Sequence, residues 1–210
     1  MVTYVTGNYG KYISVKEKFE KYNIDINYYK CDIDELNIND IEKISKDKAR
    51  QAYLKLNSPV FVVDSGFYIR SYPNNPNYPG AFVKRCGVAK NVEELLNTMK
   101  DVRDRYCFFL DCLTYYDGLN YYTFFGKSEG TLSYKVTGND LIQAKSNLWK
   151  VFIPKNYTKT LAEMTEDERK NRGEIGATEK FINWYKENLN AKNLVLKKNI
   201  WNVEKILNIC

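Results

Sequence analysis

The order of the predicted elements indicates an α/β fold. Two short apolar segments, Val2–Val5 and Val60–Val63, have the composition of buried strands. Helical spacing of apolar residues follows the first strand, over residues 12–22, and precedes the second, over residues 40–56. Strands that alternate with helices in this way are typical of a sheet flanked by helices.

The second half of the chain adds an antiparallel part. Strand-like runs over residues 106–116 and 119–125 flank Asp117-Gly118, a dipeptide that favours a tight hairpin. Residues 71–80 are rich in proline and asparagine and predict a loop. The remaining predicted elements are a strand over 24–30, a short helix over 92–99, a turn over 126–130, a strand over 131–136, a short strand before Pro154, a helix over 165–172 that starts with a capping box, and a helix over 178–189.

The net charge of +6 favours anionic ligands. The basic residues are interspersed with acidic ones and form no dense stripe before the C-terminal tail, so small phosphorylated substrates fit as well as nucleic acid does. Nucleic acid is therefore not the partner we expect. The chain holds no histidine, which excludes imidazole as a base or metal ligand and favours a hard cation held by oxygen.

The five cysteines and the apolar runs bear on localisation. The cysteine number is odd and includes no C-x-x-C pair, which argues against a complete disulfide framework and favours a reducing cytoplasm. The sequence shows no secretion signal, and its apolar runs are too short to span a bilayer. We therefore expect a cytoplasmic protein without a membrane partner.

The first candidate for chemistry is Asp64. Because Asp64-Ser65-Gly66 directly follows the apolar run, we predict that a buried strand ends there and delivers the carboxylate to its C-terminal edge. The alternative is that Asp-Ser-Gly only turns the chain.

A second polar segment follows the N-terminal strand. Thr6, Gly7 and Asn8 form a glycine-bearing loop, and Lys11 lies at the start of the next predicted helix. Backbone N–H groups at a helix start attract anions, and a lysine neutralises them, so this loop predicts a phosphate site. It matches neither a Walker loop nor a dinucleotide fingerprint, and an ordinary strand-to-helix turn stays an alternative.

Two further charged residues are candidates for the same cleft. Lys48 lies late in the predicted helix that feeds the strand before Asp64, so it reaches the cleft if it faces inward; otherwise it is a surface lysine. Glu35 belongs to an acidic loop over residues 31–36, and such loops are usually solvated.

The order of the motifs resembles that of the inosine triphosphate pyrophosphatase family. The resemblance runs in one register from about residue 2 to 189 and predicts a single domain over residues 1–190 with a C-terminal extension over 191–210. The motifs are Thr6-Gly7-Asn8 with Lys11, Asp64-Ser65-Gly66, Tyr78-Pro79-Gly80-Ala81-Phe82-Val83-Lys84, Gly126 with Gly130, and Tyr157-Thr158-Lys159-Thr160-Leu161-Ala162-Glu163-Met164.

This resemblance implies an elongated, two-lobed α/β fold in which a long mixed sheet is flanked by helices and the lobes enclose the active-site cleft. It also implies homodimers and hydrolysis of a nucleoside triphosphate between its α and β phosphorus atoms, with Mg²⁺ or Mn²⁺. By position, Thr6, Asn8 and Lys11 would bind the triphosphate, Glu35 and Asp64 the metal, Lys48 and Lys84 would face the phosphates, Ser65 would contact substrate, and Asp64 would orient or deprotonate the attacking water.

The chain departs from the family pattern mainly where the base is read. The family's base-stacking segment aligns with residues 146–150, and only Trp149 offers a ring there; it either stacks on the base or fills the core. The family's Ser-His-Arg element aligns with Gly173-Glu174-Ile175, although a shift of three residues would bring Arg172 into its place. Arg169 matches a substrate-contacting lysine, and Val63 stands where a second carboxylate is usual.

These departures predict a base preference that is different from, or broader than, the preference for deaminated purines. An unpaired base edge discriminates strongly against binding. Two other function classes stay open: a catalytically weak nucleotide-binding or regulatory homologue, and an interaction protein that uses the lysine-bearing tail over residues 191–210.

Overall fold

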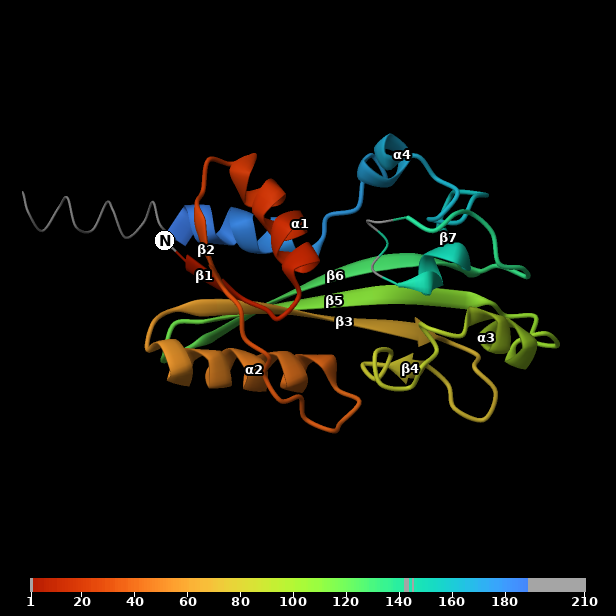
Figure 1. Ribbon diagram of the computed structural model, residues 1–210, viewed down its shortest axis with the longest axis horizontal. Helices are drawn as coiled ribbons and strands as arrows, with labels where there is room; N and C mark the ends of the chain where they lie inside the picture. Colours follow the sequence, from red (N-terminus) through yellow and green to blue (C-terminus); the bar gives the residue numbers. More distant parts are fainter. Residues whose placement is uncertain (1, 142–143, 145, 189–210) are drawn as a thin grey trace, which may run out of the picture.

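The computed structural model describes residues 2–141, 144 and 146–188, and it confirms the predicted α/β fold. A seven-stranded mixed sheet with the order β2-β1-β3-β5-β6-β7, to which β4 is joined through β3, carries helices on both faces (Figure 1). The predicted tail over 191–210 lies outside the described residues. The elements are β1 (Val2–Val5), α1 (Tyr9–Glu20), β2 (Ile26–Tyr29), α2 (Ile41–Leu56), β3 (Val60–Ile69), β4 (Tyr78–Gly80), α3 (Val92–Thr98), β5 (Tyr106–Tyr116), β6 (Tyr121–Leu132), the 3-10 turn η1 (Asn147–Lys150), β7 (Phe152–Pro154), α4 (Glu166–Lys170) and a helix over residues 177–188.

Side-chain caps set the starts of the helices that were predicted from sequence. Asn8 accepts a hydrogen bond from the backbone N–H of Lys11 and so begins α1, while Asp40 caps α2 in the same way. The capping box expected at Thr165 and Glu168 is present at the start of α4. The hairpin at Asp117-Gly118 is also confirmed, because β5 and β6 pair antiparallel on either side of it.

β3 does not end at Asp64, so the prediction of an acid at a strand terminus is wrong. The strand continues to Ile69, and Asp64 lies in its middle. Ser65 and Gly66 pair with Asp111 and Leu110 of β5, and this ladder overrides the turn tendency of Asp-Ser-Gly.

The predicted turn over residues 126–130 and the separate strand over 131–136 are also wrong, because β6 runs unbroken to Leu132. The two glycines serve close packing instead of a turn. A Cβ on Gly126 would lie 2.4 Å from the backbone nitrogen of Ala177, and one on Gly130 would lie 2.3 Å from the carbonyl oxygen of Ile153.

Two apolar cores lie at opposite ends of the long strands β3 and β5. One surrounds Phe61 and Phe181, and the other surrounds Phe67 and Phe152. Since alternate residues of a strand share a face, Ser65 lies on the same face between Phe61 and Phe67. The two cores form the predicted lobes, and the polar stretch between them leaves room for a cleft. A third, smaller cluster under α2 contains Val5, Ala49, Ala52, Val60 and Val62.

The middle of β3 has an open edge. β1 pairs with β3 only at Val60 and Phe61, whereas β4 pairs with it only at residues 67–69. Within the described part of the chain, no strand pairs with residues 62–66 on this side. Asp64 therefore lies at a gap in the sheet, where loops from both lobes can approach it.

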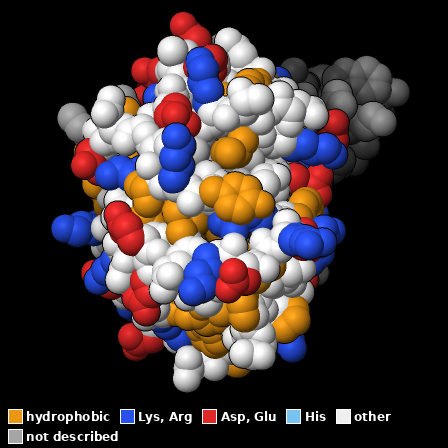
Figure 2. Space-filling view, turned by 90° about the vertical axis from the view of Figure 1, so that its right-hand side faces the viewer, with side chains coloured by type: hydrophobic (Ala, Val, Ile, Leu, Met, Phe, Trp, Pro, Cys, Tyr) orange, Lys and Arg blue, Asp and Glu red, His pale blue; other side chains and the backbone are white. Residues whose placement is uncertain are grey.

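The end of the molecule that carries α3 shows basic and acidic side chains interspersed with small hydrophobic areas (Figure 2). This agrees with the mixed charge pattern of the sequence on that face. None of the helices in the described ranges has the length and apolar character that a membrane crossing requires.

We predict that Gly126→Ala lowers the free energy of unfolding by about 1–3 kcal/mol, because the added methyl group collides with the backbone at residues 176 and 177. Urea unfolding followed by circular dichroism measures this loss.

Gly10→Ala is the matched control, since its Cβ would meet only the Asn8 side-chain oxygen at 3.3 Å and alanine favours a helix. Its unfolding free energy should stay level or rise by up to about 1 kcal/mol. Equal behaviour of the two variants would contradict the packing role of Gly126.

Candidate active site

A cavity of about 820 Å³ lies at the gap in β3, between the two apolar cores. Its walls come from the loop before α1, the loop over residues 31–35, the inner face of α2, the middle of β3 and the segment over 81–89. Segments far apart in the sequence thus meet at one place. Of the residues predicted from sequence, it is lined by Thr6, Gly7, Asn8, Lys11, Glu35, Lys48, Asp64, Ser65, Lys84, Trp149 and Arg172.

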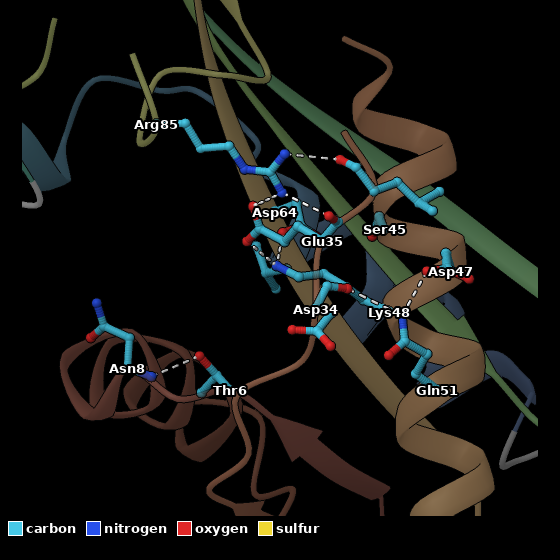
Figure 3. A network of polar contacts seen from close by, with 12 residues as sticks. Thr6, Asn8, Asp34, Glu35, Ser45, Asp47, Lys48, Gln51, Asp64 and Arg85 are labelled. Carbon is cyan, nitrogen blue, oxygen red and sulfur yellow. Dashed lines mark hydrogen bonds and ion pairs between the residues drawn. The ribbon is translucent and has the colours of Figure 1, made fainter. Parts of the chain in front are cut away.

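An ion-paired cluster of three lining residues, Glu35, Lys48 and Asp64, forms part of the cavity wall (Figure 3). The ammonium group of Lys48 lies 2.5 Å from Oδ1 of Asp64 and 2.7 Å from Oε1 of Glu35. Only 17% of the Lys48 side chain is exposed, so the surface-lysine alternative is wrong. Lys48 reaches Asp64 because α2 packs directly on β3.

The ion pairs shift the pKa values of Glu35 and Lys48 in opposite directions. Burial raises the pKa of Glu35, but the hydrogen bond and positive charge of Lys48, with the charges of Lys84 and Arg85, outweigh it and leave the pKa below its usual value. Burial lowers the pKa of Lys48, yet Asp64 and Glu35 outweigh it and raise the pKa. Both changes favour the charged forms at neutral pH.

Arg85 anchors the acidic loop and was not predicted from sequence. Its guanidinium donates to the Glu35 carbonyl at 2.9 Å, to the Glu35 carboxylate at 3.3 Å and to the Leu36 carbonyl at 3.2 Å. These bonds hold Glu35 toward the cavity. The only local signal was its position beside Lys84.

The Thr6–Lys11 loop faces this cluster across the cavity. Thr6 Oγ1 accepts from the Asn8 backbone N–H at 3.1 Å, and Asn8 caps α1. The Lys11 ammonium reaches the Val63 carbonyl at 3.5 Å, at the open edge of β3. A Cβ at position 7 would lie 1.9 Å from Oδ1 of Asp32, so a larger residue there would require the exposed Asp32 side chain to turn away. Asp32 is a further lining carboxylate that the sequence did not single out.

Trp149, Arg172 and Ser128 line the opposite end of the cavity. Arg172 donates to the Ser128 hydroxyl at 2.8 Å and pairs with the Glu174 carboxylate at 3.0 Å. Trp149 is half-buried: it packs against the core that contains the fully buried Leu148 and also lines the cavity. The side chain can therefore pack on the core and contact a ligand at the same time.

Arg169 does not line the cavity, unlike the other residues predicted to contact substrate. Its guanidinium donates to the carbonyl groups of Leu161 and Met164, and it lies 5.6 Å from the centre of the Trp149 ring. In this position it supports Trp149 from outside the cavity.

Asp64 and Glu35 fit a divalent cation that is shared with a phosphate ligand. Of the two carboxylate oxygens of Asp64, Oδ1 pairs with Lys48, whereas Oδ2 is buried and has no hydrogen-bond partner. Oδ2 therefore remains for a cation. Among the described residues no group of three or more metal-ligating side chains occurs. This suits Mg²⁺, which usually takes one or two carboxylates together with substrate phosphates and water.

Comparison with known proteins matches the Ham1 family over residues 2–184. A dITP/XTP pyrophosphatase of Saccharolobus solfataricus is 33% identical over 168 residues, covering 80% of this chain and 83% of the relative. An inosine triphosphate pyrophosphatase of Yarrowia lipolytica is 29% identical over 175 residues, covering 79% and 85%.

Solved structures agree in fold. A HAM1 protein from Coxiella burnetii superposes with a TM-score of 0.73 at 20% identity, covering 89% of this chain and all of that one (100%). The Staphylococcus aureus Ham1 protein gives 0.69 at 20% identity, covering 90% and 99%. The resemblance seen in the ordered motifs is thus confirmed along nearly the whole described chain, and the protein belongs to the Ham1 family.

Proposed function

We propose that the chain is a Mg²⁺-dependent nucleoside triphosphate pyrophosphatase that releases a nucleoside monophosphate and pyrophosphate. The observation that carries this proposal is the cavity in which the paired acids Asp64 and Glu35 face the Thr6–Lys11 loop, with Lys48 between the two acids. Curated relatives named dITP/XTP pyrophosphatase support the same reaction class. Mn²⁺ would serve in place of Mg²⁺.

The phosphate chain is held by the loop before α1 and by ammonium groups. The first residues of α1 line the cavity together with the loop before them, and a helix start favours anions. Lys84 and Lys48 add positive charge on the facing wall. Together they stabilise the negative charge that develops on the leaving pyrophosphate.

Asp64 orients the attacking water and accepts its proton. The water oxygen bonds to the α-phosphorus as the bond from that phosphorus to the bridging oxygen breaks, and pyrophosphate leaves. Mg²⁺ held by Asp64 and Glu35 would supply Lewis-acid stabilisation of the phosphoryl oxygens. Lys48 pairs with both carboxylates before substrate arrives and helps to lower the pKa of Glu35.

The base end of the cavity supports a broad preference among 6-keto purines. Nε and Nη1 of Arg172 contact the Arg169 carbonyl, Ser128 and Glu174, and within the described residues Nη2 has no recorded acceptor. Its N–H groups match the O6 and N7 acceptors that guanine, hypoxanthine and xanthine share, whereas adenine presents an amino donor at position 6. We therefore propose that this chain separates inosine from guanosine nucleotides poorly.

The proposal includes three features that the resemblance implies: a homodimer, a cytoplasmic location and a single catalytic domain over residues 1–190 with an extension after it. The alternative is a nucleotide-binding homologue with weak catalysis. The first experiment below distinguishes the two, because it measures turnover and triphosphate binding separately.

We predict that Asp64→Asn lowers kcat by roughly 100-fold to 10,000-fold while triphosphate binding persists, because the amide cannot take the proton from water. Pyrophosphate release with Mg²⁺ measures turnover, and calorimetry measures binding. The control is Asp101→Asn, an exposed aspartate outside the cavity. A wild-type protein that binds triphosphate without turnover would favour the weakly catalytic alternative.

Lys48→Met should lower the unfolding free energy by about 1–3 kcal/mol in EDTA, because it leaves two partly buried carboxylates without their cation. Added Mg²⁺ should then raise the melting temperature more than it raises that of the wild type, since the ion compensates the same two charges. Differential scanning calorimetry with and without Mg²⁺ gives both quantities.

The exposed Lys16, which pairs with Glu20 on α1, provides the control variant Lys16→Met. Its stability should change by less than about 0.5 kcal/mol, with the wild-type response to Mg²⁺. If Lys48→Met showed no larger response to Mg²⁺ than this control, the shared cation site would be refuted.

For base selection, we expect kcat/KM for GTP to lie within about tenfold of kcat/KM for ITP and XTP, and kcat/KM for ATP to be lower than all three. Arg172→Gln should reduce kcat/KM for the keto purines by about 10-fold to 100-fold and change ATP less. The exposed Arg50→Gln serves as control. A preference for ITP and XTP over GTP that clearly exceeds tenfold would contradict this assignment.

A further inference from the structure

Asp111 is a charged residue on an otherwise apolar strand face. It lies on β5, where its neighbours across the sheet are Ser65 of β3 and Gly126 of β6, and it lines the cavity. Its carboxylate is thus on the floor of the cleft, between the two cores. The other residues on the same face of β5 are Cys107, Phe109, Leu113 and Tyr115.

Fold stability does not account for this carboxylate. Asp111 is half-buried, and within the described ranges its side chain makes no hydrogen bond or ion pair. Partial burial of a charge without a partner is unfavourable. By contrast, Asp64 is paired with Lys48, and Glu35 is paired with both Lys48 and Arg85. Asp111 is therefore placed to meet a ligand.

The strand register fixes where along the ligand Asp111 would act. Lys11 contacts the carbonyl of Val63, Asp111 lies opposite Ser65 two residues farther along, and Ser128 belongs to the row of Phe67 and Phe109, two residues farther again. At about 3.3 Å per strand residue, the three rows span roughly 13 Å. Asp111 lies midway between the phosphate end and the end with Arg172.

The group of a nucleotide that lies between its phosphates and its base is the sugar. Sugar hydroxyls are hydrogen-bond donors, and an ionised carboxylate only accepts, so the two are complementary. Phosphate oxygens and an aspartate repel each other, which argues against a phosphate contact at this position.

We propose that Asp111 accepts a hydrogen bond from a sugar hydroxyl of the bound nucleotide and makes the protein discriminate against nucleotides that lack that hydroxyl. This inference rests on the proposed nucleotide substrate and deepens it. A hydrogen bond to a charged group changes affinity on the order of tenfold to a hundredfold. Selection of that size should appear for every base, because the sugar is common to all.

The test compares ITP with its 2′-deoxy and 3′-deoxy analogues, and GTP with the same two analogues, using the full chain. Pyrophosphate release with Mg²⁺ gives kcat/KM, and calorimetry in EDTA gives equilibrium binding without turnover. The variants are Asp111→Asn and Asp111→Ala, with the exposed Asp101→Asn as the matched control. Thermal unfolding of each variant confirms that it is folded.

We expect the wild type and the control to favour the ribonucleotide over at least one deoxy analogue by about tenfold or more, and the Asp111 variants to bring that ratio close to one by losing ribonucleotide activity. A wild-type ratio near one for both analogues, or a ratio that the Asp111 variants leave unchanged, overturns the assignment.

The two measurements separate this inference from the proposed function. Turnover without sugar selection overturns the role of Asp111 and leaves the pyrophosphatase intact. Sugar-selective binding without turnover, lost in Asp111→Asn, supports the role of Asp111 while the catalytic proposal fails.

Discussion

The open edge of β3 is the constraint on which the rest of the site depends. β1 stops pairing with β3 after Phe61, and pairing with β4 starts only at Phe67. One edge of β3 is therefore unpaired over five residues (62–66), while β5 pairs with β3 along the other edge. Backbone groups at such an edge need partners. The Lys11 ammonium supplies one at the Val63 carbonyl, and the cavity occupies the remaining space. A ligand can thereby reach both faces of one strand, with Asp64 on one and Ser65 on the other.

Charge balance then explains why the acids tolerate this position. Asp64 is only 8% exposed, and a carboxylate so deeply buried needs a cation nearby. Lys48 supplies it from α2, and Arg85 holds Glu35 against the same ammonium group. These ion pairs involve both oxygens of Glu35 and Oδ1 of Asp64. Oδ2 of Asp64 is buried and has no hydrogen-bond partner. Lys11 and Lys84 add positive charge at the cavity wall, which favours an anionic ligand.

The sequence predicted those parts of the site that depend on neighbouring residues. The strand, glycine loop and helix start around Asn8 form a local unit, and the inward face of α2 follows from helical spacing. The loop and Lys48, both candidates from the sequence, accordingly line the cavity. The predicted strand end was wrong at Ser65 and Gly66, because pairing with β5 overrides the local turn signal there. The predicted turn was wrong at Gly126, because this glycine allows the backbone at residue 177 to pack close to β6. The role of Arg85 could not be seen locally, because its partners lie about fifty residues earlier in the chain.

The two ends of the cavity are built on different principles. At the end with the Thr6–Lys11 segment, backbone geometry shapes the cavity wall, because α1 begins there with Asn8 as its cap and Gly7 lies close to the Asp32 side chain. At the opposite end, the lining comes from η1 and from the segment after α4, where side chains such as Arg172 and Glu174 pair with each other and with Ser128. Side-chain pairs can be exchanged without moving the backbone, whereas a helix terminus cannot. The departures from the family pattern seen in the sequence at residues 146–150 and 173–175 lie in these segments, where an exchange of side chains can leave the backbone in place.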